Sequence, residues 1–134
     1  MKQTHTVMSA KVRKEIGADP EYSRCGLQGL HQDTIGSCGG RITREHAMIN
    51  AGKKIQQQWA IIPCCARHHG VDQFQDAHTE APKEMRVWVA LNRATEDELL
   101  EYPRSNYVQA RARLNQRYGL YAPPPVSAAA GILY

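Results

Sequence analysis

Three cysteines and one histidine have the residue types of a structural zinc site, although Cys25 and Cys38 lie further apart than the two cysteines of a usual zinc knuckle. Cys65 and His68 lie three residues apart, which places them on the same side of a helix. Cys25 and Cys38 bring the set to three thiolates and one imidazole, a common closed zinc shell. Cys64 is the alternative to Cys65, and we favour Cys65 because Cys64 continues the apolar run before it. The sequence therefore predicts a structural Zn²⁺ at Cys25, Cys38, Cys65 and His68, against the competing interpretation of buried free thiols.

A second set, Glu45, His46 and His69, has the chemistry needed to hydrolyse a phosphodiester bond. Adjacent helical residues point about 100° apart, so His69 faces away from the zinc ligand His68 and toward Glu45. A carboxylate and an imidazole can hold Mg²⁺ or Mn²⁺, which would stabilise charge on the phosphate. His46 titrates near neutral pH and is the candidate general base. Because strand residues alternate between faces, Glu45 and His46 can share one site only at a strand end or a bulge.

Short elements must position both sets of residues. Residues 41–48 alternate polar and apolar side chains, which is typical of a strand or hairpin arm. Residues 59–62 form a short apolar strand that we expect to end at Pro63. A helix should run from Cys65 to about Gln75, although Gly70 lies within it. The glycine-rich segment 25–40 should form a loop without a helix.

Helices are predicted in the last third of the chain. Residues 83–93 have helical spacing, with Met85, Trp88 and either Val89 or Leu91 on one face. Residues 95–98 read as a capping box ahead of a second helix. A third helix should begin at Ser105 or Asn106 and end at Gly119.

The bulk composition fits one small domain with a thin core. The chain has 134 residues, 42% of them hydrophobic, with one Phe and two Trp. Its net charge of +4 is compatible with a polyanionic partner, although a solvated basic surface explains it equally well. Neither a membrane-spanning run nor a secretory signal is evident, so we expect a cytoplasmic protein in which cysteines beside histidines bind metal. Candidate phosphate contacts are Arg41, Arg44, Lys53, Lys54 and Arg67.

The stretch from residue 25 to about residue 75 resembles the HNH, or ββα-metal, endonuclease family, particularly its small phage and prophage members. The family has an acidic residue and a histidine at the end of a first strand. An apolar strand then leads to a cysteine, two residues, another ligand and a histidine. The matching residues are Glu45-His46 and Ile61-Ile62-Pro63-Cys64-Cys65-Ala66-Arg67-His68-His69. Residues 38–69 are also similar to phage recombination-enhancement nucleases.

This resemblance implies an α+β fold, in which a small zinc-stapled ββα-metal motif is followed by C-terminal helices. It implies that His46 is the general base and that Glu45 and His69 hold the catalytic Mg²⁺ or Mn²⁺. The middle asparagine of the family motif has no clear counterpart, since Asn50 is early and Gln58 lies closer to the expected place. The structural zinc would be bound by Cys25, Cys38, Cys65 and His68.

The resulting interpretation divides the chain into a loosely ordered lead-in (1–24), a nuclease core (25–80), helices of the same domain (81–119) and a flexible tail (120–134). The expected function is a metal-dependent DNA endonuclease of phage or prophage origin, acting in recombination or DNA processing in the cytoplasm of a bacterial host. A recombination or replication protein is a candidate partner beside DNA. The alternative is a non-catalytic zinc module that binds DNA or protein.

Overall fold

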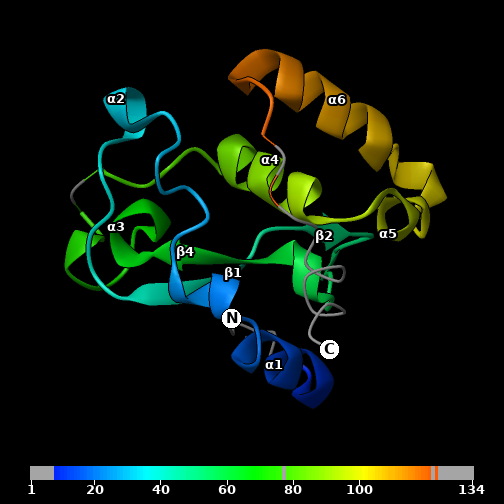
Figure 1. Ribbon diagram of the computed structural model, residues 1–134, viewed down its shortest axis with the longest axis horizontal. Coiled ribbons are helices and arrows are strands. Elements are labelled where there is room, and N and C mark those ends of the chain that lie inside the picture. Colours follow the sequence, from blue (N-terminus) through cyan, green and yellow to red (C-terminus); the bar gives the residue numbers. More distant parts are fainter. Residues whose placement is uncertain (1–7, 77, 122, 124–134) are drawn as a thin grey trace.

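The computed structural model describes residues 8–76, 78–121 and 123, and it is an α+β fold of short strands and six α-helices within those residues. Figure 1 shows a two-stranded sheet at the centre, with α4 and α6 on one side and α1 on the other. No helix of the described part of the chain has the length and apolarity to cross a membrane. The predicted α+β class is therefore correct. The proposed tail lies almost wholly outside the described residues.

The central sheet consists of β1 (Ile42–His46) and β4 (Ile61–Cys65), which pair antiparallel. Glu45 lies opposite Ile62, and Arg44 lies opposite Pro63. The prediction that Pro63 ends the second strand is wrong, because the strand continues through it to Cys65. A proline is tolerated in a sheet of only two strands, where its missing N–H can face away from the partner strand. The Pro63 carbonyl instead accepts a hydrogen bond from the Gly26 N–H (2.8 Å).

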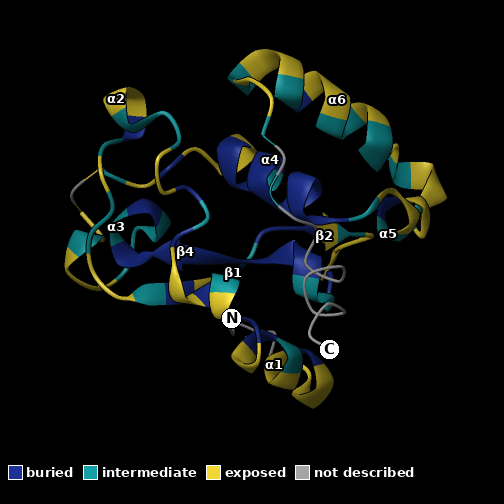
Figure 2. Cartoon of the chain, in the orientation of Figure 1, coloured by how far each residue is buried: buried dark blue, intermediate teal, exposed yellow. Residues whose placement is uncertain are grey.

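A small hairpin and a turn connect the two central strands. β2 (Ile49–Asn50) and β3 (Lys53–Lys54) pair antiparallel around a turn in which Ala51 and Gly52 both have positive φ. A single 3₁₀ turn at Gln58–Ala60 then leads into β4 and buries Trp59. Strand β4 is buried along its whole length, as Figure 2 shows in dark blue.

Helix α1 (Ala10–Gly17) covers one side of the sheet. Its residues Val12 and Ile16 pack with Tyr22 and Ile61 in a small separate cluster. Ser9 caps the helix by accepting a hydrogen bond from the Val12 N–H (3.2 Å). The lead-in therefore contains a packed helix, where the sequence predicted loose order, because its two apolar residues lie one helical turn apart and share a face.

The main core lies on the other side, under α4 (Lys83–Arg93), α5 (Glu96–Leu100) and α6 (Tyr107–Tyr118). The bounds of α4 and α6 are those that the sequence predicted, but Asn106 makes no side-chain capping hydrogen bond at the start of α6. Helix α5 begins after Thr95, as predicted, and ends at Leu100. The α5 capping box is present, with Thr95 and Glu98 each bonding the other's main chain. Met85, Trp88, Val89 and Leu91 are all buried.

Two expectations around the metal-binding segments are wrong. The glycine-rich segment contains one helical turn, α2 (Gln32–Ile35), rather than loop alone. Helix α3 covers only Ala66–His69 and ends at Gly70, which adopts a left-handed conformation (φ 74°). Glycine reaches this conformation at little cost, so it ends the helix well before Gln75, and a 3₁₀ turn at Asp72–Phe74 follows.

Candidate metal centres

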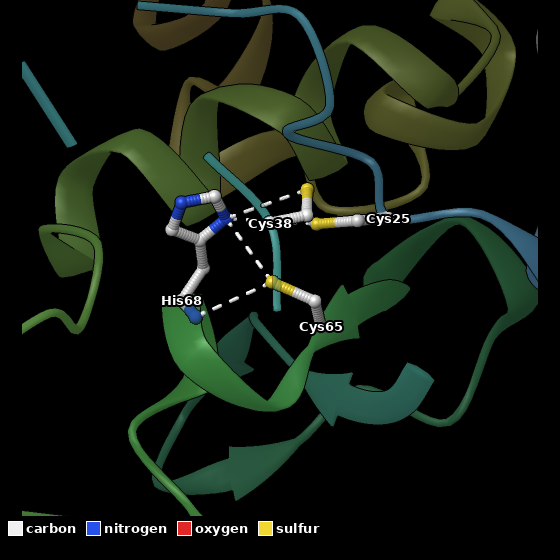
Figure 3. A group of neighbouring side chains, drawn as sticks. All are labelled: Cys25, Cys38, Cys65 and His68. Atoms are coloured by element: carbon white, nitrogen blue, oxygen red, sulfur yellow. Dashed lines mark hydrogen bonds between the residues drawn. The ribbon is translucent and has the colours of Figure 1, made fainter. Parts of the chain in front are cut away.

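Cys25, Cys38, Cys65 and His68 converge on one point from three separate segments of the chain. Cys25 follows the 3₁₀ turn at Pro20–Ser23, and Cys38 follows α2. Cys65 ends β4 and caps α3, which carries His68. Figure 3 shows the three sulfur atoms directed at the imidazole ring. Their ligand atoms all lie within 4.8 Å of one another.

The distances in this cluster fit a tetrahedral ion. His68 Nδ1 lies 3.2 Å from the Sγ of Cys65, 3.8 Å from that of Cys25 and 3.9 Å from that of Cys38. Zinc bond lengths in a tetrahedral shell require sulfur and nitrogen ligands to be about 3.6 Å apart. The cluster can therefore hold a metal ion such as zinc, with the four ligands that the sequence predicted.

The second nitrogen of His68 explains why its first is free for a metal. Nε2 lies 2.9 Å from the Gly36 carbonyl oxygen, which can only accept, so Nε2 carries the proton. Nδ1 then presents its lone pair to the three cysteines. A hydrogen bond of this kind fixes the tautomer and ring orientation of metal-binding histidines.

The three cysteines of the cluster lie so close together that their negative charges oppose one another unless a cation lies between them. Hydrogen bonding from Cys64 is the largest of the effects that lower the pKa of Cys25 to about 3. Burial, followed by the negative charges of Cys25 and Cys65, raises the pKa of Cys38. Hydrogen bonding with Cys25 and burial raise the pKa of Cys64, which remains a neutral thiol outside the ligand set. The choice of Cys65 over Cys64 as a member of the cluster is confirmed.

Glu45 and His69 form a second, smaller pair beside the cluster. Glu45 Oε1 lies 3.9 Å from His69 Nε2. Two ligands bound to the same divalent ion at about 2.1 Å are separated by about 3 to 4.2 Å, depending on their angle. Glu45 is 8% exposed, and its Oε1 has no hydrogen-bond partner among the described residues. A buried carboxylate oxygen without a partner is a costly arrangement that a cation would satisfy.

Thr43 determines which nitrogen of His69 faces Glu45. The Thr43 hydroxyl donates its only proton to the Cys64 carbonyl oxygen (2.7 Å). Its oxygen lies 2.6 Å from His69 Nδ1, so it must accept the Nδ1–H. His69 Nε2 therefore carries a lone pair directed at the Glu45 side. Burial, followed by the charge of Arg86, lowers the pKa of His69, which keeps the ring neutral and able to bind metal.

Arg86 of α4 holds the other oxygen of Glu45. Its guanidinium forms a short, buried ion pair with Glu45 Oε2 and a second pair with Glu80 (2.7 Å). Burial nevertheless raises the pKa of Glu45, with Arg86 opposing the shift. Arg86 thus orients the carboxylate and leaves Oε1 toward His69.

His46, the predicted general base, is not brought to this pair. It follows Glu45 in β1, where consecutive side chains point to opposite faces of the sheet. Its Nε2 is buried and has no hydrogen-bond partner among the described residues. Burial, followed by the charge of Lys54, lowers its pKa, and hydrogen bonding to Gln56, which accepts from the imidazole, opposes this shift.

Neither candidate for the middle asparagine bonds His46. Asn50 Oδ1 accepts a hydrogen bond from the Ser105 hydroxyl (2.7 Å), and the Gln58 amide donates to Asp19 (2.9 Å). The role expected of that asparagine has no counterpart at these two positions.

The predicted phosphate-contacting residues are spread over several elements. Arg41 pairs with Asp72 (2.8 Å), and Arg67 donates to the Ser37 carbonyl (2.9 Å) in the loop around the cluster. Arg44 is exposed on β1, and Lys53 and Lys54 are exposed on β3. None of these contacts identifies a nucleic-acid surface.

Sequence reasoning missed two of the residues that shape the pair. Thr43 lies two positions before Glu45, and the period of a strand would have placed it on the same face. Arg86 lies three residues before Val89 and therefore on the apolar face of α4. A charged residue on that face is the sequence feature that could have identified it. Its partner Glu45 is 41 residues away and could not be read from the sequence.

Comparison with known proteins adds no relative: no family model, curated protein or solved structure matches this chain.

Proposed function

We propose that this protein is a metal-dependent endonuclease of the HNH type that hydrolyses phosphodiester bonds in DNA. In this proposal β1, β4 and α3 constitute the ββα-metal motif. The main support for the proposal is the position of two potential metal ligands. Glu45 Oε1 and His69 Nε2 each have a free lone pair and lie 3.9 Å apart. One ligand comes from the first strand and the other from the helix, as in the family that the sequence resembles.

The donor set of this pair fits Mg²⁺ or Mn²⁺, since both ions accept carboxylate oxygen and imidazole nitrogen. Such an ion would supply positive charge to a phosphate in the transition state. Thr43 keeps Nε2 of His69 unprotonated, and Arg86 keeps the Glu45 carboxylate in one orientation. His46 remains the proposed base, and burial lowers its pKa, so its imidazole is neutral as this role requires. Its Nε2 is buried on the opposite face of β1 from Glu45, so the role also requires the ring to move toward the pair.

The cysteine cluster has a structural role in this proposal. A four-ligand shell of three thiolates and one imidazole leaves no open position for substrate. Its ion would fix the segment 25–40 and the start of α3, which carries His69 next to His68. The proposed biological setting is a phage or prophage product acting on DNA in a bacterial cytoplasm, with a recombination or replication protein as partner.

A non-catalytic zinc module that binds DNA or protein is the second candidate, and one observation favours it. Arg86 already neutralises Glu45, and His46 lies on the opposite face of β1 from it. In such a module Glu45 and Arg86 would be a structural ion pair, and only the cysteine cluster would bind metal.

Cleavage of plasmid and single-stranded DNA with Mg²⁺ or Mn²⁺ tests both candidates. We would compare the wild type with His69→Ala and His46→Ala, use His78→Ala as an exposed-histidine control, and quantify zinc in each protein. The nuclease proposal predicts cleavage by the wild type and the control, loss of cleavage in the other two variants, and equal zinc in all four. Zinc-loaded wild type without cleavage would favour the binding module. Loss of the fold in His46→Ala would instead make His46 a structural residue.

A further inference from the structure

Arg93, the last residue of α4, is a buried cation without an anionic partner. It is 4% exposed, and its Nε has no hydrogen-bond partner among the described residues. No described carboxylate forms an ion pair with it, in contrast to Arg86 on the same helix. Buried arginines are normally paired, because removing an unpaired charge from water is costly.

The groups around Arg93 do not cancel its charge. Its guanidinium lies over the ring of Tyr22, 5.1 Å from the centroid, an arrangement that attracts a cation but carries no net charge. The Tyr22 hydroxyl lies 2.6 Å from the carbonyl oxygens of both Gln58 and Ile61 and donates its one proton to this pair of acceptors. Burial raises the pKa of Tyr22 to about 12, so the phenol is neutral at pH 7. The end of α4 contributes only the partial negative charge of its carbonyl groups.

A pocket of about 400 Å³ opens beside this guanidinium. Its wall also contains Arg24 and Glu21, which pair with each other at 3.3 Å and are more exposed than Arg93. The lining places two arginines against one glutamate, and the charge of the Cys25 thiolate would be shared with the metal ion of the cysteine cluster. The remaining lining residues are Cys25, Gly26, Gln28, Gly29, Tyr121 and Pro123.

We propose that this pocket binds a terminal phosphate group, with Arg93 at its base and Arg24 closer to solvent. The planar guanidinium matches two phosphate oxygens at once, and the Gln28 amide is a further donor in the wall. Because Arg93 is so deeply placed, it is accessible to the end of a ligand rather than to a continuous backbone. Free phosphate and the 5′-phosphate of a nucleic acid share this chemistry. The proposal does not depend on nuclease activity.

The Nε–H signal of Arg93 in a ¹H–¹⁵N spectrum of the full chain gives a direct test. Three probes would be titrated at constant ionic strength: inorganic phosphate, a short oligonucleotide with a 5′-phosphate, and the same oligonucleotide with a 5′-hydroxyl. Disappearance of the signal in Arg93→Lys would assign it. The proposal predicts a saturable shift with at least one of the two terminal-phosphate probes and none with the 5′-hydroxyl oligonucleotide.

A matched pair of variants at other arginines tests phosphate binding even if variants of Arg93 do not fold. Arg24→Met should weaken phosphate binding by about tenfold, the effect of removing one charge-assisted hydrogen bond. Arg113→Met, which removes an exposed arginine on α6, should bind like the wild type. Tighter binding of the 5′-phosphate oligonucleotide than of inorganic phosphate would assign the site to nucleic-acid ends, and equal or weaker binding would assign it to free phosphate. An unchanged Arg93 signal, or an equal shift with the 5′-hydroxyl probe, would overturn the proposal and leave Arg93 a structural cation on Tyr22.

Discussion

His68 and His69 are adjacent residues of one short helix, yet they present opposite nitrogens to their sites. His68 donates through Nε2 to Gly36 and offers Nδ1 to three cysteines. His69 donates through Nδ1 to Thr43 and offers Nε2 toward Glu45. The residue type is the same, so the difference comes from the hydrogen-bond acceptor behind each ring. The acceptor selects the tautomer, and the tautomer selects the metal-binding atom.

The two sites also differ in how complete they are. The cysteine cluster supplies four donors and is closed around one position. The Glu45–His69 pair supplies two donors, while Arg86 and Thr43 occupy the remaining atoms of both side chains. A closed shell suits a structural ion, and an open one leaves room for water and substrate. The comparison therefore predicts that damage to the cluster affects folding, whereas damage to the pair affects ion binding and activity.

The largest expected effect is the loss of one cluster ligand. Cys65→Ser should unfold the protein at ordinary temperature, because structural zinc contributes about 10–16 kcal/mol in small zinc domains. Circular dichroism with metal analysis measures both quantities, and a strong chelator should reproduce the effect in the wild type. If the variant binds no zinc and still melts like the wild type, the cluster is not needed for folding, and the proposed difference between the two sites is wrong.

Removing Arg86 should have the next largest effect on stability. Arg86→Met leaves Glu45 as a buried carboxylate without its partner, which costs about 3–5 kcal/mol. The double variant Arg86→Met with Glu45→Gln should recover part of this loss, since no buried charge then remains unpaired. Urea denaturation of both variants measures the recovery, and an additive loss would show that the two side chains are not coupled.

Replacing His69 should separate activity from stability. His69→Ala removes one of the two donors, and the lost charge stabilisation of several kcal/mol corresponds to a decrease in cleavage of about a hundredfold or more. Zinc content should not change, because His68 and the cysteines are untouched. Loss of zinc together with activity would place His69 in the cluster.

Thr43 offers a finer test of the tautomer argument. Thr43→Val keeps the shape of the side chain but cannot accept from His69 Nδ1. We expect a 10- to 100-fold loss of Mn²⁺ affinity, the usual effect of removing the group behind a metal-binding histidine, with only about 1 kcal/mol of stability lost. Thr43→Ser should restore the affinity. Equal Mn²⁺ binding by the valine and serine variants would contradict this role.

The smallest effect is expected at Cys64, the cysteine outside both sites. Cys64→Ala should cost about 1 kcal/mol, typical of a buried substitution, and keep a full complement of zinc. Paired with Cys65→Ser, it is the matched control for the ligand assignment. Zinc loss from Cys64→Ala alone would exchange the roles of the two cysteines.

The cysteine cluster and the C-terminal helices could be predicted from the sequence because both depend on local spacing. Cys65 and His68 are three positions apart, which already places them on the same side of a helix, and Thr95 with Glu98 specifies a cap. The length of α3 was predicted wrongly, because the helix ends where Gly70 adopts a left-handed conformation, and the local turn decides that conformation. Pro63 was misread as a strand end because its tolerance depends on how many strands the sheet has.

Contacts between residues far apart in the sequence could not be predicted from the sequence pattern alone. The ion pair of Glu45 with Arg86 joins β1 to α4, and the burial of Val12 and Ile16 depends on Ile61 of β4. The nuclease assignment and the position of His46 as its base stay predictions for the cleavage assay.

The distance along the chain between the cluster's residues has a consequence for how the protein is made. Cys25 and His68 are 43 residues apart, and the two cysteines nearest the N-terminus leave the ribosome long before the other two ligands. Until His68 has been synthesised, Cys25 and Cys38 are reactive thiols open to oxidation or to the wrong metal. We therefore expect the yield of folded protein during synthesis to follow the supply of zinc at the moment the chain passes residue 68, even when total zinc in the cell is ample.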